Sequence, residues 1–184
     1  MKSRLSKPNL KCSRLEFSRF GALIQIVTSD TENSLDICTV AMGDRREIDM
    51  DALELKLCDI QGRLFELSLA KGYDSEKFVS AFMTSDVAKH LDSEYNRLQW
   101  AGEEYVLEEL VSEKEITGGE TIDREMLYWS GYLYRYWHFY TGESSKEIYK
   151  QAPIKTMKVV YLMYHTMSPE MAIDRLKESK GENK

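Results

Sequence analysis

Eight of the thirteen residues from Tyr128 to Tyr140 are Tyr, Trp or Phe, in the run YWSGYLYRYWHFY. At 100° per residue, these side chains cover nearly the whole circumference of a helix, not one face of it. Such a helix is stable in water when other elements surround it. The run therefore predicts a central core helix in a mainly all-α fold. The alternative is an aromatic-walled pocket or a protein-binding patch, because Tyr and Trp offer large contact areas with a polar tip.

Helical periodicity begins near residue 50. Apolar residues recur at steps of three and four, which places one stripe along a helix: Leu53, Leu57, Ile60, Leu64 and Leu67. We expect this helix to end near Lys71, because Gly72 can take the left-handed conformation at little steric cost. Cys58 lies beside this stripe and is expected to be a small core residue.

Two short helices should follow, each with a polar cap. Asp74 or Ser75 can start the first, and Ser85 or Asp86 can start the second. A side-chain oxygen at these positions accepts a hydrogen bond from an amide of the first turn. The capping residues thus predict both helix starts.

A longer helical segment is predicted from about Asp92 to Val111. Its apolar members are Tyr95, Leu98, Trp100, Tyr105, Val106 and Leu110. Gly102 lies within it and costs roughly 1 kcal/mol relative to Ala. We expect a break or a kink near this glycine.

Clear boundary signals mark the last third of the chain. The aromatic helix should begin at about Thr121 or Ile122 and end at Thr141-Gly142. A capping box, Ser144 to Glu147, predicts a helix that ends at about Ala152, since Pro153 cannot continue it.

Residues 154–166 form the next predicted helix, and Ser168 with Pro169 starts the last one, to about Glu178. The layout from Ser144 to Tyr164 resembles a helix-turn-helix. A recognition helix needs Arg, Asn, Gln or Lys side chains that bind DNA base edges, and after Lys158 the second helix continues with Val, Tyr, Leu and Met. A core position is the better prediction for that helix.

The predicted organisation is a helical domain at 50–178, preceded by a possible β-hairpin at 20–49 and a basic flexible arm at 1–19, with a disordered tail at 179–184. The first 20 residues carry a net charge of +5 and the remainder −11. A basic arm can bind nucleic acid, whereas an acidic body disfavours wide phosphate contact. The candidate nucleic-acid-binding residues are Arg4, Lys7, Lys11, Arg14 and Arg19.

Two polar residues interrupt the aromatic helix. Arg135 must reach water, stack on a ring or meet a carboxylate, and His138 is close enough in angle to share its surroundings. Together with a carboxylate from another helix they would form an anion-binding or acid–base site. The candidate pocket or interaction residues are Tyr128, Trp129, Tyr132, Arg135, Tyr136 and His138.

Common catalytic and cofactor signatures do not occur in the sequence. Its three histidines lack metal-site spacing, and neither a phosphate-binding glycine motif nor GxSxG is present. We expect no metal and no cofactor, and the sequence favours a non-enzymatic protein. The widely spaced cysteines and the absence of a long apolar stretch predict a cytoplasmic protein without a membrane span.

The order of elements resembles a family of small bacterial helical proteins of unknown function, found beside toxin-like, ADP-ribosyltransferase-related genes. The resemblance spans about residues 71–178 and rests on Lys71 to Ser75, Thr141 to Tyr149, His165-Thr166 and Ala172 to Asp174. Residues 1–49 depart from the family pattern, so either they are an addition or translation starts later, at Met42 or Met50.

The resemblance implies a protein that binds a toxin-like protein partner, as an antitoxin or an accessory subunit of a toxin–antitoxin-like operon. An acidic body would suit a basic partner surface. Two alternatives stay open: a small-molecule or enzymatic site around Arg135 and His138, and a nucleic-acid-binding regulator that uses the basic arm.

Overall fold

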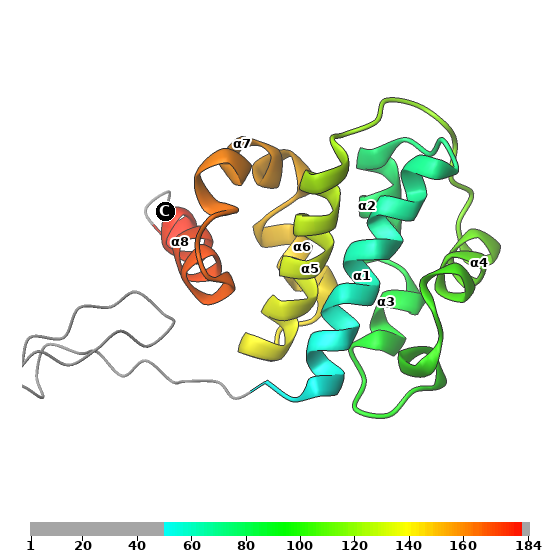
Figure 1. Cartoon of the computed structure of the whole chain (residues 1–184), viewed down its shortest axis with the longest axis horizontal. Helices are drawn as coiled ribbons and strands as arrows, with labels where there is room; N and C mark the ends of the chain where they lie inside the picture. Colours follow the sequence, from blue (N-terminus) through cyan, green and yellow to red (C-terminus); the bar gives the residue numbers. More distant parts are fainter. Residues whose placement is uncertain (1–49, 182–184) are drawn as a thin grey trace, which may run out of the picture. The chain divides into compact units, whose positions relative to one another are not determined.

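Two antiparallel helices, α1 (Ala52–Ala70) and α5 (Arg124–Thr141), pack along their length at the centre of the fold (Figure 1). The computed structural model describes residues 50–181, which belong to the second of two units of the chain, Ile48–Lys184. The expected basic arm and hairpin lie outside the described residues. α5 is the aromatic run, and its central position confirms the prediction of a core helix.

Glycines allow α1 and α5 to approach closely. A Cβ atom on Gly131 would lie 2.6 Å from the carbonyl oxygen of Gln61, and one on Gly62 would lie 2.8 Å from the ring of Tyr128. Both distances are shorter than real Cβ contacts, so only glycine fits at these points. Gly62 and Gly131 thus allow the short spacing between α1 and α5.

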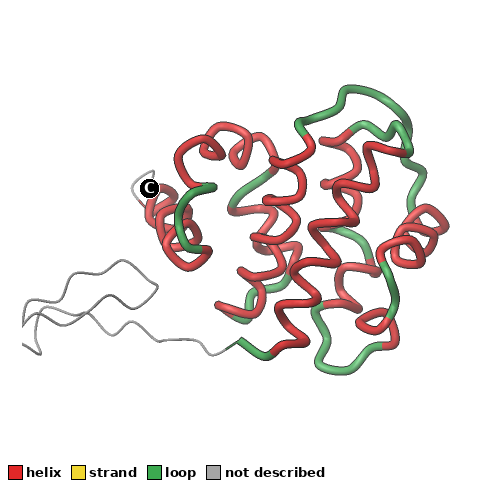
Figure 2. The backbone as a smooth tube through the Cα atoms, in the orientation of Figure 1, coloured by secondary structure: helices red, strands yellow, loops and turns green. Residues whose placement is uncertain are grey.

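Shorter helices cover the central pair on both sides (Figure 2). They are α2 (Ser75–Met83), α3 (Asp86–Leu91), the 3-10 helix η1 (Arg97–Trp100), α4 (Glu103–Glu113), α6 (Ser145–Gln151), α7 (Ile154–Tyr164) and α8 (Pro169–Gly181). The described residues contain eight α-helices and no strand, only an isolated bridge between Tyr73 and Gly118. The all-α fold class is confirmed for this part of the chain.

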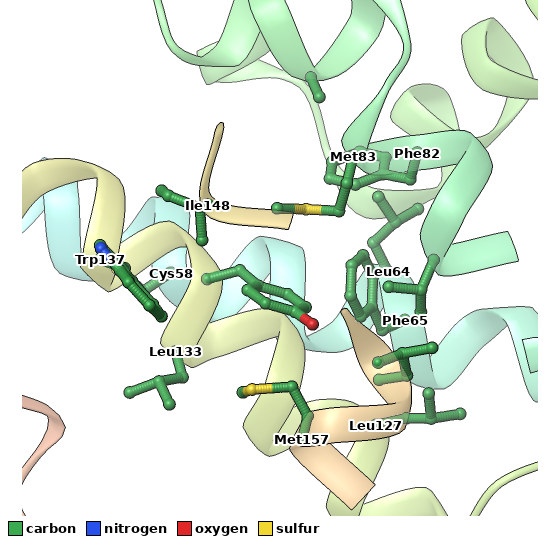
Figure 3. Close-up of a cluster of buried hydrophobic side chains, with 14 of the residues drawn as sticks. Cys58, Leu64, Phe65, Phe82, Met83, Leu127, Leu133, Trp137, Ile148 and Met157 are labelled. Carbon is green, nitrogen blue, oxygen red and sulfur yellow. The ribbon is translucent and has the colours of Figure 1, made fainter. Parts of the chain in front are cut away.

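The core lies where α1, α2, α5, α6 and α7 converge (Figure 3). Phe65 of α1 makes edge-to-face contacts with Phe78, Phe82 and Tyr134, at centroid distances of 5.9, 5.4 and 6.4 Å. Cys58 is fully buried beside them, as expected. Aromatic side chains from three helices therefore form the centre of the packing.

Local capping explains where the helices begin and end. Asp74 accepts a hydrogen bond from the Lys77 amide at 3.0 Å, and Ser85 accepts one from the Ala88 amide at 3.0 Å. The box of Ser144 and Glu147 forms as predicted. α1 and α5 are each followed by a left-handed glycine, Gly72 with φ 71° and Gly142 with φ 73°. The aromatic helix begins a little later than expected, with Asp123 as its cap.

The segment expected to be helical from Asp92 contains only the short η1 before Gly102. Asp92 ends α3, and its carboxylate is held by other elements. Asn96 then caps η1, and Gly102 becomes the N-cap of α4. The break at Gly102 is confirmed, but Tyr95 and Trp100 are exposed instead of being apolar members of a buried stripe.

The prediction of a core position for α7 holds for one face of the helix only. Ile154 and Met157 are buried, and Val160, Tyr161 and Tyr164 are partly buried against the core. Val159, Leu162 and Met163 on the other face are exposed. α7 packs on α2 and α5 from one side, which leaves its other face open. α8 also continues past Glu178 to Gly181, further than expected.

Replacing Gly131 by Ala tests the close approach of α1 and α5. Ala is normally favoured over Gly inside a helix, but here its Cβ would overlap the Gln61 carbonyl. We expect G131A to lower the free energy of unfolding by about 1–3 kcal/mol in urea titrations. The control G102S, at an N-cap with space for a side chain, should change stability by less than about 0.5 kcal/mol. Equal stability of G131A and the native chain would contradict the close contact.

Candidate functional site

Arg135 lies inside the protein with its guanidinium fully engaged. Its side chain is 1% exposed, and it projects from α5 toward α1 and the end of α3. Nε donates to Oε1 of Gln61 at 2.8 Å, and Nη1 donates to Oδ1 of Asp92 at 2.7 Å. The sequence left three environments open for Arg135, namely water, an aromatic ring or a carboxylate, and the structure shows the carboxylate of Asp92.

Asp92 connects the end of α3 to α5 and α6. Besides Arg135, it accepts hydrogen bonds from the Ser145 amide at 2.8 Å and from the Ser145 hydroxyl at 2.7 Å. Ser145 is the first residue of α6, where a helix amide has no partner within its own helix. The Asp92–Arg135 cluster, which we define as Gln61, Asp92, Arg135 and Ser145, therefore joins α1, α3, α5 and α6.

The charge balance of this cluster is that of a buried ion pair. Burial lowers the pKa of the Arg135 guanidinium, and the charge of Asp92 and its hydrogen bond oppose the shift. Cys58 lies near the same guanidinium, but burial dominates and raises the pKa of its thiol to about 12. Cys58 is thus a neutral thiol at physiological pH, which does not suit a nucleophile.

His138 stands at the edge of the Asp92–Arg135 cluster. Its Nδ1 lies 2.8 Å from the carbonyl oxygen of Glu143 and 3.9 Å from Oδ1 of Asp92. A carbonyl can only accept, so Nδ1 carries the proton and donates to it. Arg135 and His138 do share one environment, as predicted, and His138 fixes the chain that follows α5.

Glu143 forms a second polar centre just after α5. Its carboxylate accepts hydrogen bonds from Trp137, Thr141, Gln151 and Lys177 at 2.7–3.1 Å. Burial alone would raise its pKa, but these donors outweigh it and lower the pKa to about 2. Glu143 stays ionised at physiological pH and ties α5 and α6 to α8.

The remaining candidate residues point to separate neighbours. Tyr128 donates to Asp59 of α1 at 2.8 Å, and Tyr136 donates to Glu170 of α8. Tyr132 lies between these two rings, at 6.3 and 6.2 Å, and Trp129 packs edge-on against a tyrosine of α7 at 5.5 Å. Burial, followed by the bond to Asp59, raises the pKa of Tyr128 to about 12. These aromatic residues connect α5 to its neighbours and do not converge on Arg135.

A ligand would have to displace packed side chains to reach Arg135. A surface depression with a volume of about 570 Å³ lies elsewhere, between α2, α6 and the start of α7, with Tyr149 and Ile154 in its lining. No group of three or more metal-ligating side chains occurs among the described residues. Within the same part of the chain, no helix has the length and apolar character needed to cross a bilayer.

Sequence reasoning missed Asp92, Gln61 and Glu143. Asp92 is 43 residues before Arg135, and nothing in the local pattern distinguishes it from other helix-ending aspartates. Gln61 did carry a weak signal, because it is a polar residue beside the apolar stripe of α1.

Comparisons of the chain with protein-family models, curated proteins and solved structures give no match. The fold and the polar centres define an all-α domain with a buried ion pair at its middle.

The cost of breaking this pair can be measured. D92A leaves the Arg135 guanidinium buried without a counter-charge, so we expect a loss of about 3–5 kcal/mol in the free energy of unfolding. The double variant D92A/R135M removes both charges and should lose much less than the sum of the two single variants. Urea titrations of the native chain, D92A, R135M and D92A/R135M give the coupling energy. Additive losses would show that the two side chains do not stabilise each other.

Proposed function

We propose that this chain is a non-enzymatic protein that binds a protein partner, as an antitoxin or an accessory subunit of a toxin-like protein does. The resemblance described above supports the class of partner. The exposed apolar face of α7 supports the mode of binding. The tight packing around Arg135 favours this proposal over a small-molecule site, because the guanidinium is fully used within the fold.

One observation carries the proposal. Val159, Leu162 and Met163 are 77%, 80% and 59% exposed, and their spacing puts them on one side of α7. Single exposed apolar residues are common, but three large ones on one helical face are typical of an interaction site. We call Val159, Leu162 and Met163 the α7 face.

Charges beside the α7 face define the chemistry of its partner. Lys155 and Lys158 are exposed at its N-terminal end, and Lys155 lies 3.5 Å from Glu76. The complementary surface is apolar at its centre, with carboxylates placed to meet these lysines. An amphipathic helix laid along α7 would meet both needs.

Co-expression with the protein encoded by the neighbouring gene tests this function. We expect the two proteins to co-purify and any growth inhibition by the partner to be relieved. L162S/M163S should abolish co-purification while leaving the circular dichroism spectrum unchanged, because both side chains are exposed.

The matched control is L55S, which removes an exposed leucine from α1 and should bind like the native chain. Failure to co-purify, together with unchanged growth inhibition, would contradict the function. Native binding by L162S/M163S would instead show that α7 is not the surface used.

A further inference from the structure

Three large aromatic side chains around η1 and α4 are exposed. Tyr95 is 91% exposed, Trp100 77% and Tyr105 41%. None of the three packs against another aromatic ring of the described residues. Aromatic side chains that stay in water bury little apolar area, so they contribute little to the stability of the fold.

Local contacts hold these residues in defined positions. Gln99 donates to the Ser93 carbonyl at 2.5 Å and also closes the cap of η1 on Asn96, so the segment that carries Tyr95 and Trp100 is folded onto itself. Arg97 of η1 lies 3.7 Å from Glu109 of α4, and Glu109 accepts a hydrogen bond from Tyr105. The aromatic side chains therefore stand on a fixed support.

The same segment is strongly acidic. Residues 94–115 hold seven glutamates against Arg97 and Lys114, a net charge of −5. One of the seven, Glu113, serves the fold by accepting hydrogen bonds from the first amides of α3. Glu104 and Glu108 are exposed and form no hydrogen bond or ion pair with another residue that the structure describes.

α4 presents acidic and aromatic groups on one side. At 100° per residue, Glu104, Tyr105 and Glu108 fall within one third of the helix circumference, and all three are exposed. With Tyr95, Trp100 and Glu109 they make up what we call the acidic aromatic surface. α4 and α7 lie on opposite sides of the α1–α5 pair, so this surface is separate from the α7 face (Figure 1).

We propose that the acidic aromatic surface binds an arginine- and lysine-rich segment of another protein. A guanidinium stacks on the face of Trp or Tyr and at the same time pairs with a nearby carboxylate. Arg97 already pairs with Glu109, the carboxylate that accepts a hydrogen bond from Tyr105, so a guanidinium can reach a carboxylate next to a tyrosine here. The inference does not rest on the proposed function, because it uses a different surface.

Charge complementarity favours a basic protein segment over nucleic acid, anionic lipid or an apolar partner. The segment that carries this surface, residues 94–115, has a net charge of −5 and repels phosphates, which disfavours nucleic acid and anionic lipid. An apolar partner would fit the rings but would leave the exposed carboxylates without counter-charges. A basic segment satisfies both kinds of side chain.

Binding of a fluorescein-labelled oligoarginine peptide to the full chain, followed by fluorescence anisotropy, tests the inference. We expect saturable binding that weakens as salt is added, and no binding of an oligoglutamine peptide. Y95A/W100A should weaken binding roughly threefold to thirtyfold, since it removes the cation–π partners. Both residues are exposed, and circular dichroism will report whether the fold is kept.

Two charge variants separate this surface from general attraction. E104Q/E108Q should weaken binding and reduce its salt dependence, whereas E120Q/E178Q removes the same charge from exposed sites elsewhere and should have little effect. Equal effects of the two pairs, with native binding by Y95A/W100A, would overturn the proposal.

Two further outcomes would also overturn it. Calcium that displaces the peptide more strongly than sodium chloride of equal ionic strength would identify a metal site. A dimer that Y95A/W100A converts to a monomer would identify a second copy as the occupant. L162S/M163S should bind the peptide like the native chain. Failure of peptide binding at the acidic aromatic surface can therefore be distinguished from failure of partner binding at the α7 face.

Discussion

The buried ion pair between Asp92 and Arg135 is the interaction on which the arrangement of helices depends. An arginine in the middle of a central helix is costly to bury, and it is tolerated because a carboxylate and an amide oxygen meet its donors. Asp92 also supplies the acceptor that the start of α6 requires. A single aspartate thus joins the end of α3, the aromatic helix α5 and the start of α6.

Close packing of α1 and α5 works together with this pair. Gly131 and Gly62 let the two backbones approach, and Gln61 then contributes its carbonyl to the contact and its side chain to Arg135. Tyr128 and Tyr136 of α5 combine packing with a polar contact in a similar way. The ring of each packs inside the fold, and its hydroxyl donates a hydrogen bond to a carboxylate on a neighbouring helix. The aromatic helix is therefore a packing centre, and its tyrosine hydroxyls and its arginine form specific hydrogen bonds with the helices around it.

Local signals in the sequence were sufficient for most of the fold. The caps at Asp74, Ser85 and Ser144 and the glycines at 72 and 142 depend on residues a few positions apart, so they can be read without a structure. The carboxylate that meets Arg135 could be expected as a type of residue but not as Asp92, because 43 residues separate the two. The exposure of α7 and of Trp100 was not predictable, since apolar content alone does not reveal which face has a neighbour.

Hydrogen exchange at the Ser145 amide tests the central role of Asp92 most directly. This amide is at the first position of α6 and its acceptor is Asp92, 53 residues away. We expect this amide to exchange only through opening of the core, with a protection free energy close to that of global unfolding. The first amides of α4, at Glu103 and Glu104, follow a glycine cap without a side chain and should exchange rapidly in the same sample. Exchange at Ser145 as fast as at those two residues would contradict the central role of Asp92.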